Sequence, residues 1–151
     1  MRKYSCYIPV ILILISFCSI ILFRGSLTRY ASRIMTNGME PEEKSIVENI
    51  ISEQYDYSKN TKEYECTFLE FGSVGCNSCR QMESVMAEIK HKYSKRVKVV
   101  FINVSQKENR ELVDYFGIVT IPTQVLLDKK GKEYFRHNGY LSSDDLSKHF
   151  K

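Results

Sequence analysis

The sequence predicts an α/β fold, in which a central β-sheet is flanked by helices and preceded by an N-terminal transmembrane helix. Two observations predict the domain. Apolar runs of strand length alternate with segments of helical periodicity, and a glycine-containing turn separates two short strand-like runs near the C-terminus. A third observation, an apolar run near the N-terminus, predicts the transmembrane helix. The length of 151 residues allows one domain plus such an extension.

The N-terminal apolar run is densest over residues 8–23 and follows two basic residues. Counted from residue 4 it has about 20 residues, which is enough for a helix to cross the hydrocarbon core of a bilayer. We therefore expect residues 1–23 to form an uncleaved membrane anchor that contacts the lipid bilayer through residues 4–23.

A cleaved signal peptide is the competing interpretation of this run. Cleavage needs small residues at the cut site, and residues 23–26 and 29–31 supply that pattern poorly. A lipoprotein site needs small residues just before its cysteine, but Cys18 follows an Ile-Ser-Phe sequence. Lysine and arginine residues nearly balance on the two sides of the run, so the positive-inside rule does not decide the orientation.

Two segments separate the apolar run from the predicted domain. Residues 24–40 are polar and include two glycines, which is typical of a linker. Residues 41–63 are expected to form an N-terminal helix and a loop that pack on the domain. Pro41 suits the first helical position. One face of this helix, which runs to about Tyr55, would hold Ile46, Val47, Ile50 and Ile51.

Residues 64–151 are expected to form the α/β domain. Residues 97–104 are almost continuously apolar and β-branched, which predicts a strand buried on both faces. A lysine-rich turn with Gly131 indicates a hairpin, and Ser142 and Asp145 have the spacing of a capping box. The predicted elements are strands over residues 67–71, 97–104, 124–127 and 133–136, and helices after residue 79, over residues 109–116 and after residue 142.

Cys76 and Cys79 lie where the first strand of the domain gives way to a helical pattern. That places Cys76 at or next to a helix N-terminus, where unpaired backbone N–H groups and the helix dipole stabilise a negative charge. A thiolate is such a charge, so the pKa of Cys76 should fall below the ordinary value of about 8.5. The two-residue spacing lets the second sulfur reach the first. We therefore expect a pair that cycles between dithiol and disulfide.

A structural disulfide and half of a zinc site are the alternatives for this pair. Zinc would need two more ligands, and Cys66 and His91 are too isolated in the sequence to supply them. We therefore predict no metal site. Two of the five cysteines, Cys6 and Cys18, lie in the N-terminal apolar run, so the chain has no disulfide framework. Cys66 is expected to be a small strand residue, with a regulatory thiol as the alternative.

The residues around the pair resemble those of thioredoxins. Residues 68–79, FLEFGSVGCNSC, resemble the first core strand and active-site loop of that family. Residues 116–123, FGIVTIPT, resemble its segment that carries a cis proline, and Gly131 and Gly139 fall where thioredoxins have glycines in and after the last hairpin. The resemblance covers the chain from about Tyr64 to the C-terminus. It implies a thioredoxin-like fold with a central mixed β-sheet.

Two departures from thioredoxins lie at the pair itself: Gly75 replaces the usual tryptophan, and Asn77-Ser78 replaces Gly-Pro. By the resemblance, Ile121 and Pro122 lie beside the cysteines in the fold. A cis bond before Pro122 would expose the backbone of Ile121 to pair with an extended substrate segment. Gly75 would border the same substrate. A simple turn proline is the alternative for Pro122.

Glu70 lies inside the apolar strand that precedes the pair. Burial of a carboxylate is costly unless the group is partnered or protonated. The matching thioredoxin position carries a buried aspartate that relays protons to the second cysteine, so the resemblance implies the same role for Glu70 toward Cys79. A side chain that turns to a water-filled edge is the alternative.

The resemblance implies a membrane-tethered thiol–disulfide oxidoreductase that reduces protein disulfides without a cofactor. Cys76 would attack the disulfide of a protein substrate, and Cys79 would then resolve the mixed disulfide. Membrane-tethered thioredoxins resemble bacterial proteins that work outside the cytoplasmic membrane, so we expect a single-pass cell-membrane protein with an extracytoplasmic domain. Its electron donor would be a membrane thiol carrier of the kind that serves cytochrome c maturation.

Other functions remain open at this point. The same pair would also serve a thiol oxidase or isomerase, because Asn77-Ser78 does not set the redox potential. A copper chaperone would use His137 as a distant ligand, although its place after a basic hairpin favours an ordinary surface residue. A thioredoxin-like binding protein without turnover is a further alternative. The mild net charge of +4, without a basic block, gives no indication of a nucleic-acid partner.

Overall fold

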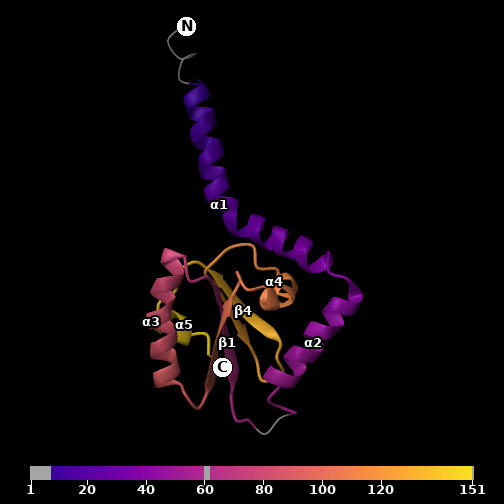
Figure 1. The fold of residues 1–151 in the computed structure, drawn as a ribbon. Helices are drawn as coiled ribbons and strands as arrows, with labels where there is room; N and C mark the ends of the chain where they lie inside the picture. The colour runs from indigo at the N-terminus through magenta and orange to yellow at the C-terminus, as the bar shows by residue number, and fades with distance from the viewer. Residues whose placement is uncertain (1–7, 60–61, 151) are drawn as a thin grey trace.

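The computed structural model describes residues 8–59 and 62–150 of the protein (Figure 1). Each strand or helix predicted in the domain has a counterpart, which confirms the expected α/β fold. The elements in chain order are α1 (Ile8–Asn37), α2 (Pro41–Tyr55), β1 (Cys66–Gly72), α3 (Asn77–Lys92), β2 (Val97–Asn103), the short 3-10 helix η1 (Lys107–Asn109), α4 (Arg110–Tyr115), β3 (Thr123–Leu127), β4 (Glu133–Asn138) and α5 (Ser143–Ser147).

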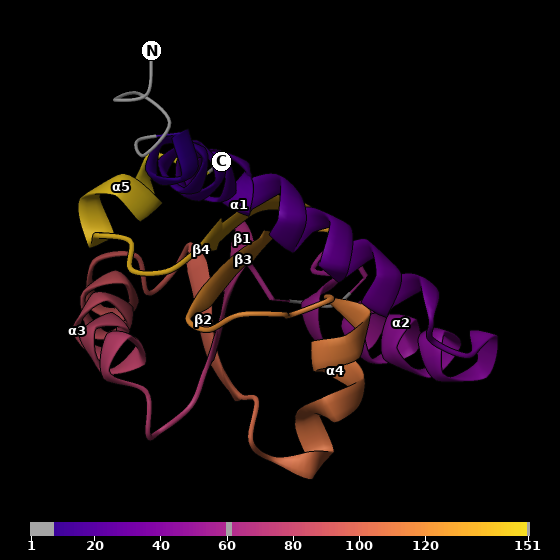
Figure 2. The ribbon, with the colours of Figure 1, turned by 90° about the horizontal axis from the view of Figure 1, so that it is seen from above.

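The four strands form one mixed sheet in the order β2-β1-β3-β4. β1 runs parallel to β2 and antiparallel to β3, and β3 runs antiparallel to β4. α3 and α5 lie on one side of the sheet, and α2 and α4 lie on the other (Figure 2). This is the mixed sheet flanked by helices that the resemblance implied.

β1 is the centre of the core, since every one of its residues is buried. Its side chains alternate between the two faces of the sheet. Phe68 packs in one cluster with Met82 of α3, whereas Leu69 packs in a second cluster with Val47 of α2. Because helices cover both faces, most of the strand is apolar. Glu70 is its one charged residue, and the alternation places it on the same face as Phe68.

β2 differs from the strand expected over residues 97–104. That prediction of a strand buried on both faces is wrong, because Lys98 on one face and Phe101 on the other are exposed. β2 lies at the edge of the sheet, pairs only with β1, and is less buried than β1. An apolar, β-branched composition indicates a strand, but it carries no information on how many neighbours the strand has.

The expected linker, residues 24–40, is helical over most of its length and belongs to α1. Leu27, Tyr30 and Ile34 recur at the spacing of one helix face, and the segment contains no proline before Pro41. The helix ends where the N–H of Gly38 donates to the carbonyl oxygen of Ile34 at 3.0 Å. Polarity and glycine content are therefore a poor guide to this segment, since its apolar periodicity supports a helix.

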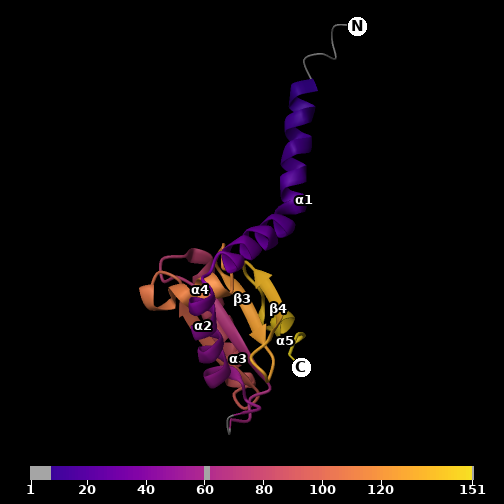
Figure 3. The ribbon, with the colours of Figure 1, turned by 90° about the vertical axis from the view of Figure 1, so that its right-hand side faces the viewer.

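The N-terminal half of α1 projects away from the domain (Figure 3). Among the described residues, no single helix is long and apolar enough to cross a membrane. The pair Pro9–Ile21 and Gly25–Asn37, bent by 56°, meets the requirement together on length and composition alone. Residues 4–7 of the expected span lie outside the described part of the chain. The membrane anchor over residues 1–23 therefore stays a prediction.

The C-terminal half of α1 packs on the domain beside α4. Thr36 Oγ1 donates to the carbonyl oxygen of Tyr115 at 3.3 Å, and Arg136 of β4 reaches Ser32 Oγ at 3.5 Å. Gly117, just after α4, has a φ of 56°, in the left-handed region. A Cβ on Gly117 would collide with the Ser32 side chain and stand 2.5 Å from its carbonyl oxygen. Glycine is therefore needed here both for its backbone conformation and for the close approach of α1.

Replacement of Gly117 by alanine should destabilise the protein through backbone strain and through collision with α1. We expect Gly117→Ala to lower the free energy of unfolding by about 2–3 kcal/mol. Gly139→Ala is the matched control, because Gly139 has a φ of 97° but open space where its Cβ would stand. Strain alone should cost that control about 1–2 kcal/mol. Urea unfolding of the full chain in detergent measures both, and equal losses would contradict the contact with α1.

Candidate active site

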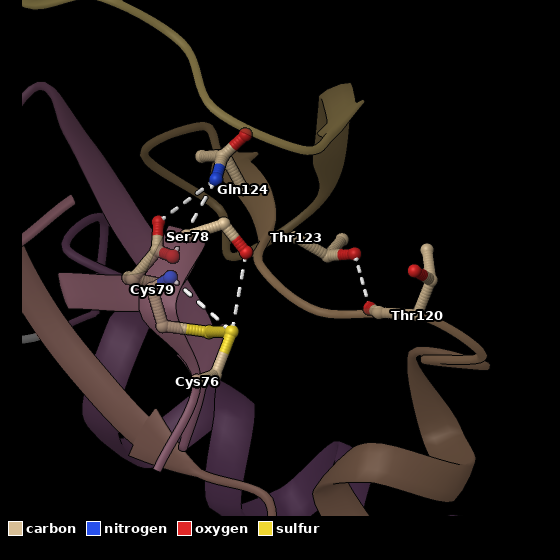
Figure 4. Close-up of a disulfide and its surroundings, with 7 residues drawn as sticks. Cys76, Ser78, Cys79, Thr120, Thr123 and Gln124 are labelled. Atoms are coloured by element: carbon tan, nitrogen blue, oxygen red, sulfur yellow. Dashed lines mark hydrogen bonds between the residues drawn. A yellow bond between two sulfur atoms is a disulfide. The ribbon is translucent and has the colours of Figure 1, made fainter. Parts of the chain in front are cut away.

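A disulfide joins Cys76 and Cys79 at the N-terminus of α3, with their Cα atoms 5.2 Å apart (Figure 4). Cys76 is the N-cap residue of α3, and Cys79 lies in its first turn. The predicted position of Cys76 at a helix N-terminus is confirmed. Cys76 is half-buried, whereas Cys79 is only 3% exposed. The first sulfur is therefore the more accessible of the two.

Two groups of the first helical turn approach the Cys76 sulfur. The backbone N–H of Cys79 donates to Cys76 Sγ at 3.2 Å, which is the capping hydrogen bond of α3. Ser78 Oγ lies 3.2 Å from the same sulfur. After reduction of the disulfide, both can donate to a thiolate on Cys76, and the helix dipole adds to their effect. Ser78 is a contact that the sequence pattern does not single out, because its motif does not tell where the hydroxyl points.

The loop before Cys76 leaves space beside the disulfide. The N–H of Cys76 donates to the carbonyl oxygen of Ser73 at 3.3 Å, which closes a turn just after β1. Gly75 is exposed, and no described atom lies within 4 Å of the place where its Cβ would stand. The flank of Cys76 where thioredoxins usually carry a tryptophan is therefore open.

The Ile121–Pro122 peptide bond is cis, as the resemblance implied. Thr123, the next residue, begins β3 and pairs with Phe71 near the end of β1. The loop that carries Cys76 leaves from that same end, so Pro122 and the disulfide lie at the same end of the sheet. Figure 4 shows the chain that leads into Thr123 facing the disulfide.

Glu70 is completely buried in the sheet. In register it lies between Phe101 of β2 and Gln124 of β3, and Gln124 Nε2 donates to its two carboxylate oxygens at 3.1 and 3.4 Å. Burial raises the pKa of Glu70 from 4.5 to about 8, and the hydrogen bond from Gln124 offsets part of that rise. The alternative of a side chain turned to a water-filled edge is therefore wrong.

The end of β1 brings the Glu70 carboxyl group toward Cys79. Gly72 follows Glu70 by two residues, so the two lie on the same face of the strand. A Cβ on Gly72 would stand 3.3 Å from Cys79 Sγ, which shows how closely β1 approaches the buried sulfur. The strand thus carries an ionisable group on the same face that approaches the second cysteine.

Gln124 is a site residue that the sequence pattern does not identify. It is buried in β3, where the following residues Val125, Leu126 and Leu127 are apolar. A lone amide in an apolar strand is a usable sign that a buried polar partner exists. Its pairing with Glu70 depends on the β1–β3 register, which only the fold supplies.

The remaining cysteine and histidine candidates do not join this site. Cys66 begins β1 at the end away from the disulfide and is buried, and burial raises the pKa of its thiol. His137 Nε2 lies 3.2 Å from the carbonyl oxygen of Tyr140. Within residues 8–59 and 62–150, no cluster of three or more His, Cys, Asp or Glu side chains is arranged to hold a metal ion.

Comparison with known proteins connects this arrangement to one family. The family model described as the thioredoxin-like domain matches residues 51–151. A thioredoxin of Alicyclobacillus acidocaldarius is 33% identical over 78 residues, which are 52% of this chain and 71% of the relative. The chloroplastic thioredoxin-like protein HCF164 of Oryza sativa subsp. japonica is 33% identical over 67 residues, which are 44% of this chain. The chain spans only 26% of the length of that chloroplast relative.

Solved structures share the fold. Thioredoxin-2, described as a component of the malaria parasite protein secretion machinery, has a TM-score of 0.51 at 26% identity over 56% of this chain and 84% of the other. Oxidized mitochondrial thioredoxin 3 of Saccharomyces cerevisiae has a TM-score of 0.53 over 70% of this chain and 86% of the other. Its identity of 19% shows a likeness of fold alone.

The raised pKa of Glu70 predicts a pH-dependent stability. Below about pH 4.5 the carboxyl group is protonated in both the folded and the unfolded chain, so its full contribution is present. As the pH rises toward the folded pKa of about 8, the unfolded chain ionises first and that stability is lost. We expect the free energy of unfolding of Glu70→Gln, relative to that of the wild type, to rise by on the order of a few kcal/mol between pH 5 and 8. Above pH 8 this difference should stay constant.

Urea unfolding of the oxidised chain from pH 5 to 9 measures this gain. Glu83→Gln is the control, because Glu83 is exposed on α3 and should follow the wild type at every pH. Parallel stability curves for Glu70→Gln and the wild type would show that Glu70 is ionised in the folded chain.

Proposed function

Because this chain belongs to the thioredoxin-like domain family, we propose that it reduces disulfides in protein substrates through the Cys76–Cys79 pair. The observation that carries the proposal is the disulfide at the N-cap of α3 with a cis proline at the same end of the sheet. One sulfur is accessible and receives hydrogen bonds from the helix turn, and the other is buried behind it. That asymmetry supports different roles for the two cysteines.

The reduced pair would act in two displacement steps. The Cys76 thiolate attacks one sulfur of the substrate disulfide, the substrate S–S bond breaks, and the released sulfur takes up a proton. Cys79 then loses its proton and attacks Cys76 Sγ. This second step frees the other substrate thiol and leaves the Cys76–Cys79 disulfide. Two electrons pass from the pair to the substrate in the complete cycle.

The surroundings of the pair suit an extended protein substrate. The cis Ile121–Pro122 bond lies beside the disulfide at the end of the sheet, and the backbone of Ile121 precedes the proline ring. The open space at Gly75 borders the other side of Cys76. A substrate segment would pair with the backbone of Ile121 while its disulfide reaches Cys76.

The proposed location is the cell membrane, with the domain on the extracytoplasmic side. Residues 1–23 would form the single-pass anchor, and the exposed apolar side chains between Val10 and Ile21 support that role. A membrane thiol carrier of the kind that serves cytochrome c maturation would return the pair to its reduced state. The domain over residues 64–151 would extend N-terminally into α2, because the family match begins at residue 51.

Mixed-disulfide trapping tests the assignment of the two cysteines. Cys79→Ser should accumulate a covalent complex with a disulfide-containing protein, because no second thiol can release it. Cys76→Ser should not, since the remaining thiol is buried. Non-reducing electrophoresis after incubation with oxidised substrate separates the two results. Trapping by Cys76→Ser alone would reverse the roles.

The reduction potential separates a reductase from an oxidase or isomerase. A value near that of thioredoxin, about −270 mV, supports the proposed direction. A value near that of protein disulfide isomerase, about −180 mV, would favour oxidation or isomerisation instead. Equilibration of the full chain in detergent with glutathione buffers gives this number.

Glu70 would accept the proton that Cys79 loses before it attacks. Its pKa of about 8 lies close to that of an ordinary thiol, which favours proton transfer between the two groups. We expect Glu70→Gln to slow the second step by roughly 10- to 100-fold near neutral pH. The first attack by Cys76 should change little.

Rapid-mixing kinetics can follow the two steps separately. In the wild type, the rate of the second step should rise with pH up to about 8 as Glu70 ionises. Loss of that rise in Glu70→Gln would support the relay. Indistinguishable second-step rates for the two proteins across pH 6 to 9 would leave Glu70 without a part in the reaction.

A further inference from the structure

The C-terminal half of α1 has two unlike faces. Thr28, Ser32 and Thr36 lie on the side that packs on the domain, where all three are partly buried. An apolar stripe, defined by Leu27, Tyr30 and Ile34, lies on the other side, and its residues are 56%, 67% and 57% exposed. The spacings of three and four residues align the stripe along the helix. A large apolar surface is therefore held away from the domain core.

The apolar stripe continues a still larger exposed surface. In the N-terminal half of α1, every large apolar side chain from Val10 to Ile21 for which exposure is described is at least 50% exposed. This half points away from the domain, whereas the C-terminal half lies across it (Figures 1 and 3). If Pro9–Ile21 stands along the bilayer normal, the bend of 56° turns Gly25–Asn37 closer to the membrane plane than to the normal.

The candidate active site lies at the end of the domain that α1 crosses. Gly117, which contacts α1, precedes the cis Ile121–Pro122 bond by a few residues. A cavity of about 500 Å³ separates α1 at Arg29 from Thr120 and Gly139, which flank that bond in the fold. Figure 1 shows α1 above the end of the sheet where α3 begins, which is the end that carries the disulfide.

From this geometry we propose that Gly25–Asn37 lies in the membrane–water interface and holds the disulfide end of the domain against the bilayer. The substrates would be disulfides close to the membrane surface, in membrane-bound proteins. This inference rests on the proposed function, since it needs both the anchor and the redox pair. It adds the orientation of the domain and the class of substrate.

Lipid is the occupant that the observations favour for the apolar stripe. The same helix leads directly from the exposed apolar half into the stripe, so both halves contact one apolar phase. Tyr30 is of a residue type enriched at membrane interfaces. Arg29 and Arg33 occupy the same helix segment and take part in no ion pair among the described residues, so their charges are available to lipid phosphates. A second copy of the chain would be the other apolar occupant, and the fluorescence experiment below separates it from lipid.

Tryptophan fluorescence tests the depth of the stripe, because the chain contains no tryptophan. Tyr30→Trp and the control Tyr64→Trp are placed singly in the full chain, in vesicles of phosphatidylcholine and phosphatidylglycerol. Tyr64 lies just before β1, at the opposite end of the sheet from the disulfide. Lipids brominated near the headgroups should quench the Tyr30→Trp emission by about half or more and leave Tyr64→Trp nearly unchanged.

Each other outcome has a distinct meaning. Failure of the chain to float with vesicles would overturn the anchor and with it this inference. Flotation with unquenched Tyr30→Trp emission would overturn the interfacial helix while leaving the anchor intact. A blue-shifted emission that depends on protein concentration and not on bromination would assign the stripe to a second copy.

Two membrane-bound probes test the substrate class. The two probes carry the same disulfide-bridged peptide. In one probe the peptide is joined directly to a lipid tail, and in the other it is joined to that tail through a long flexible Gly-Ser linker. The wild type should reduce the directly attached peptide faster, by about fivefold or more, because the disulfide end faces the bilayer. A double variant, Leu27→Ser with Ile34→Ser, should lose this preference and keep its rate on the same disulfide-bridged peptide made without a lipid tail. Equal rates of the wild type on both probes would overturn the orientation, and no reduction of any peptide would overturn the redox function instead.

Discussion

The antiparallel register between β1 and β3 holds the candidate active site together. Phe71 opposite Thr123 brings the cis proline to the end of β1 from which the Cys76 loop departs. The same register sets Glu70 opposite Gln124. A slip of one residue would turn each of these side chains to the other face of the sheet. Burial of both strands on both faces prevents that slip, so the packing of the core also fixes the geometry of the site.

The buried Glu70–Gln124 pair is the exception to an otherwise apolar sheet. One amide donor satisfies the carboxylate only in part, because desolvation still raises the pKa of Glu70 to about 8. A protonated Glu70 is compatible with the core near neutral pH, and an ionised one is costly there. Such a group lowers the stability of the fold progressively between about pH 5 and 8, yet it places an ionisable side chain on the face of β1 that approaches Cys79. Stability and the proposed chemistry therefore make opposite demands on this position.

Local sequence features determined much of the molecule. The apolar run over residues 67–71 and the helical pattern after Cys79 place the pair at a strand-to-helix junction, where the Cys76 sulfur caps α3. The Ser142 hydroxyl caps α5 through the N–H of Asp145 at 3.1 Å, as the spacing predicted. The Ile-Pro-Thr sequence indicated the cis bond through its resemblance to thioredoxins. These features depend on residues close together in the chain, which is why the sequence alone reveals them.

Tertiary structure decided the features that depend on distant partners. Gln124 became the partner of Glu70 through strand register, and β2 became an edge strand through its place in the sheet. Residues 25–37 became part of a docked helix because Gly117, far along the chain, lets α1 approach closely. Periodicity and composition report how one segment divides its polar and apolar faces. They do not report which other segment meets each face, because that is settled by the packing of the whole chain.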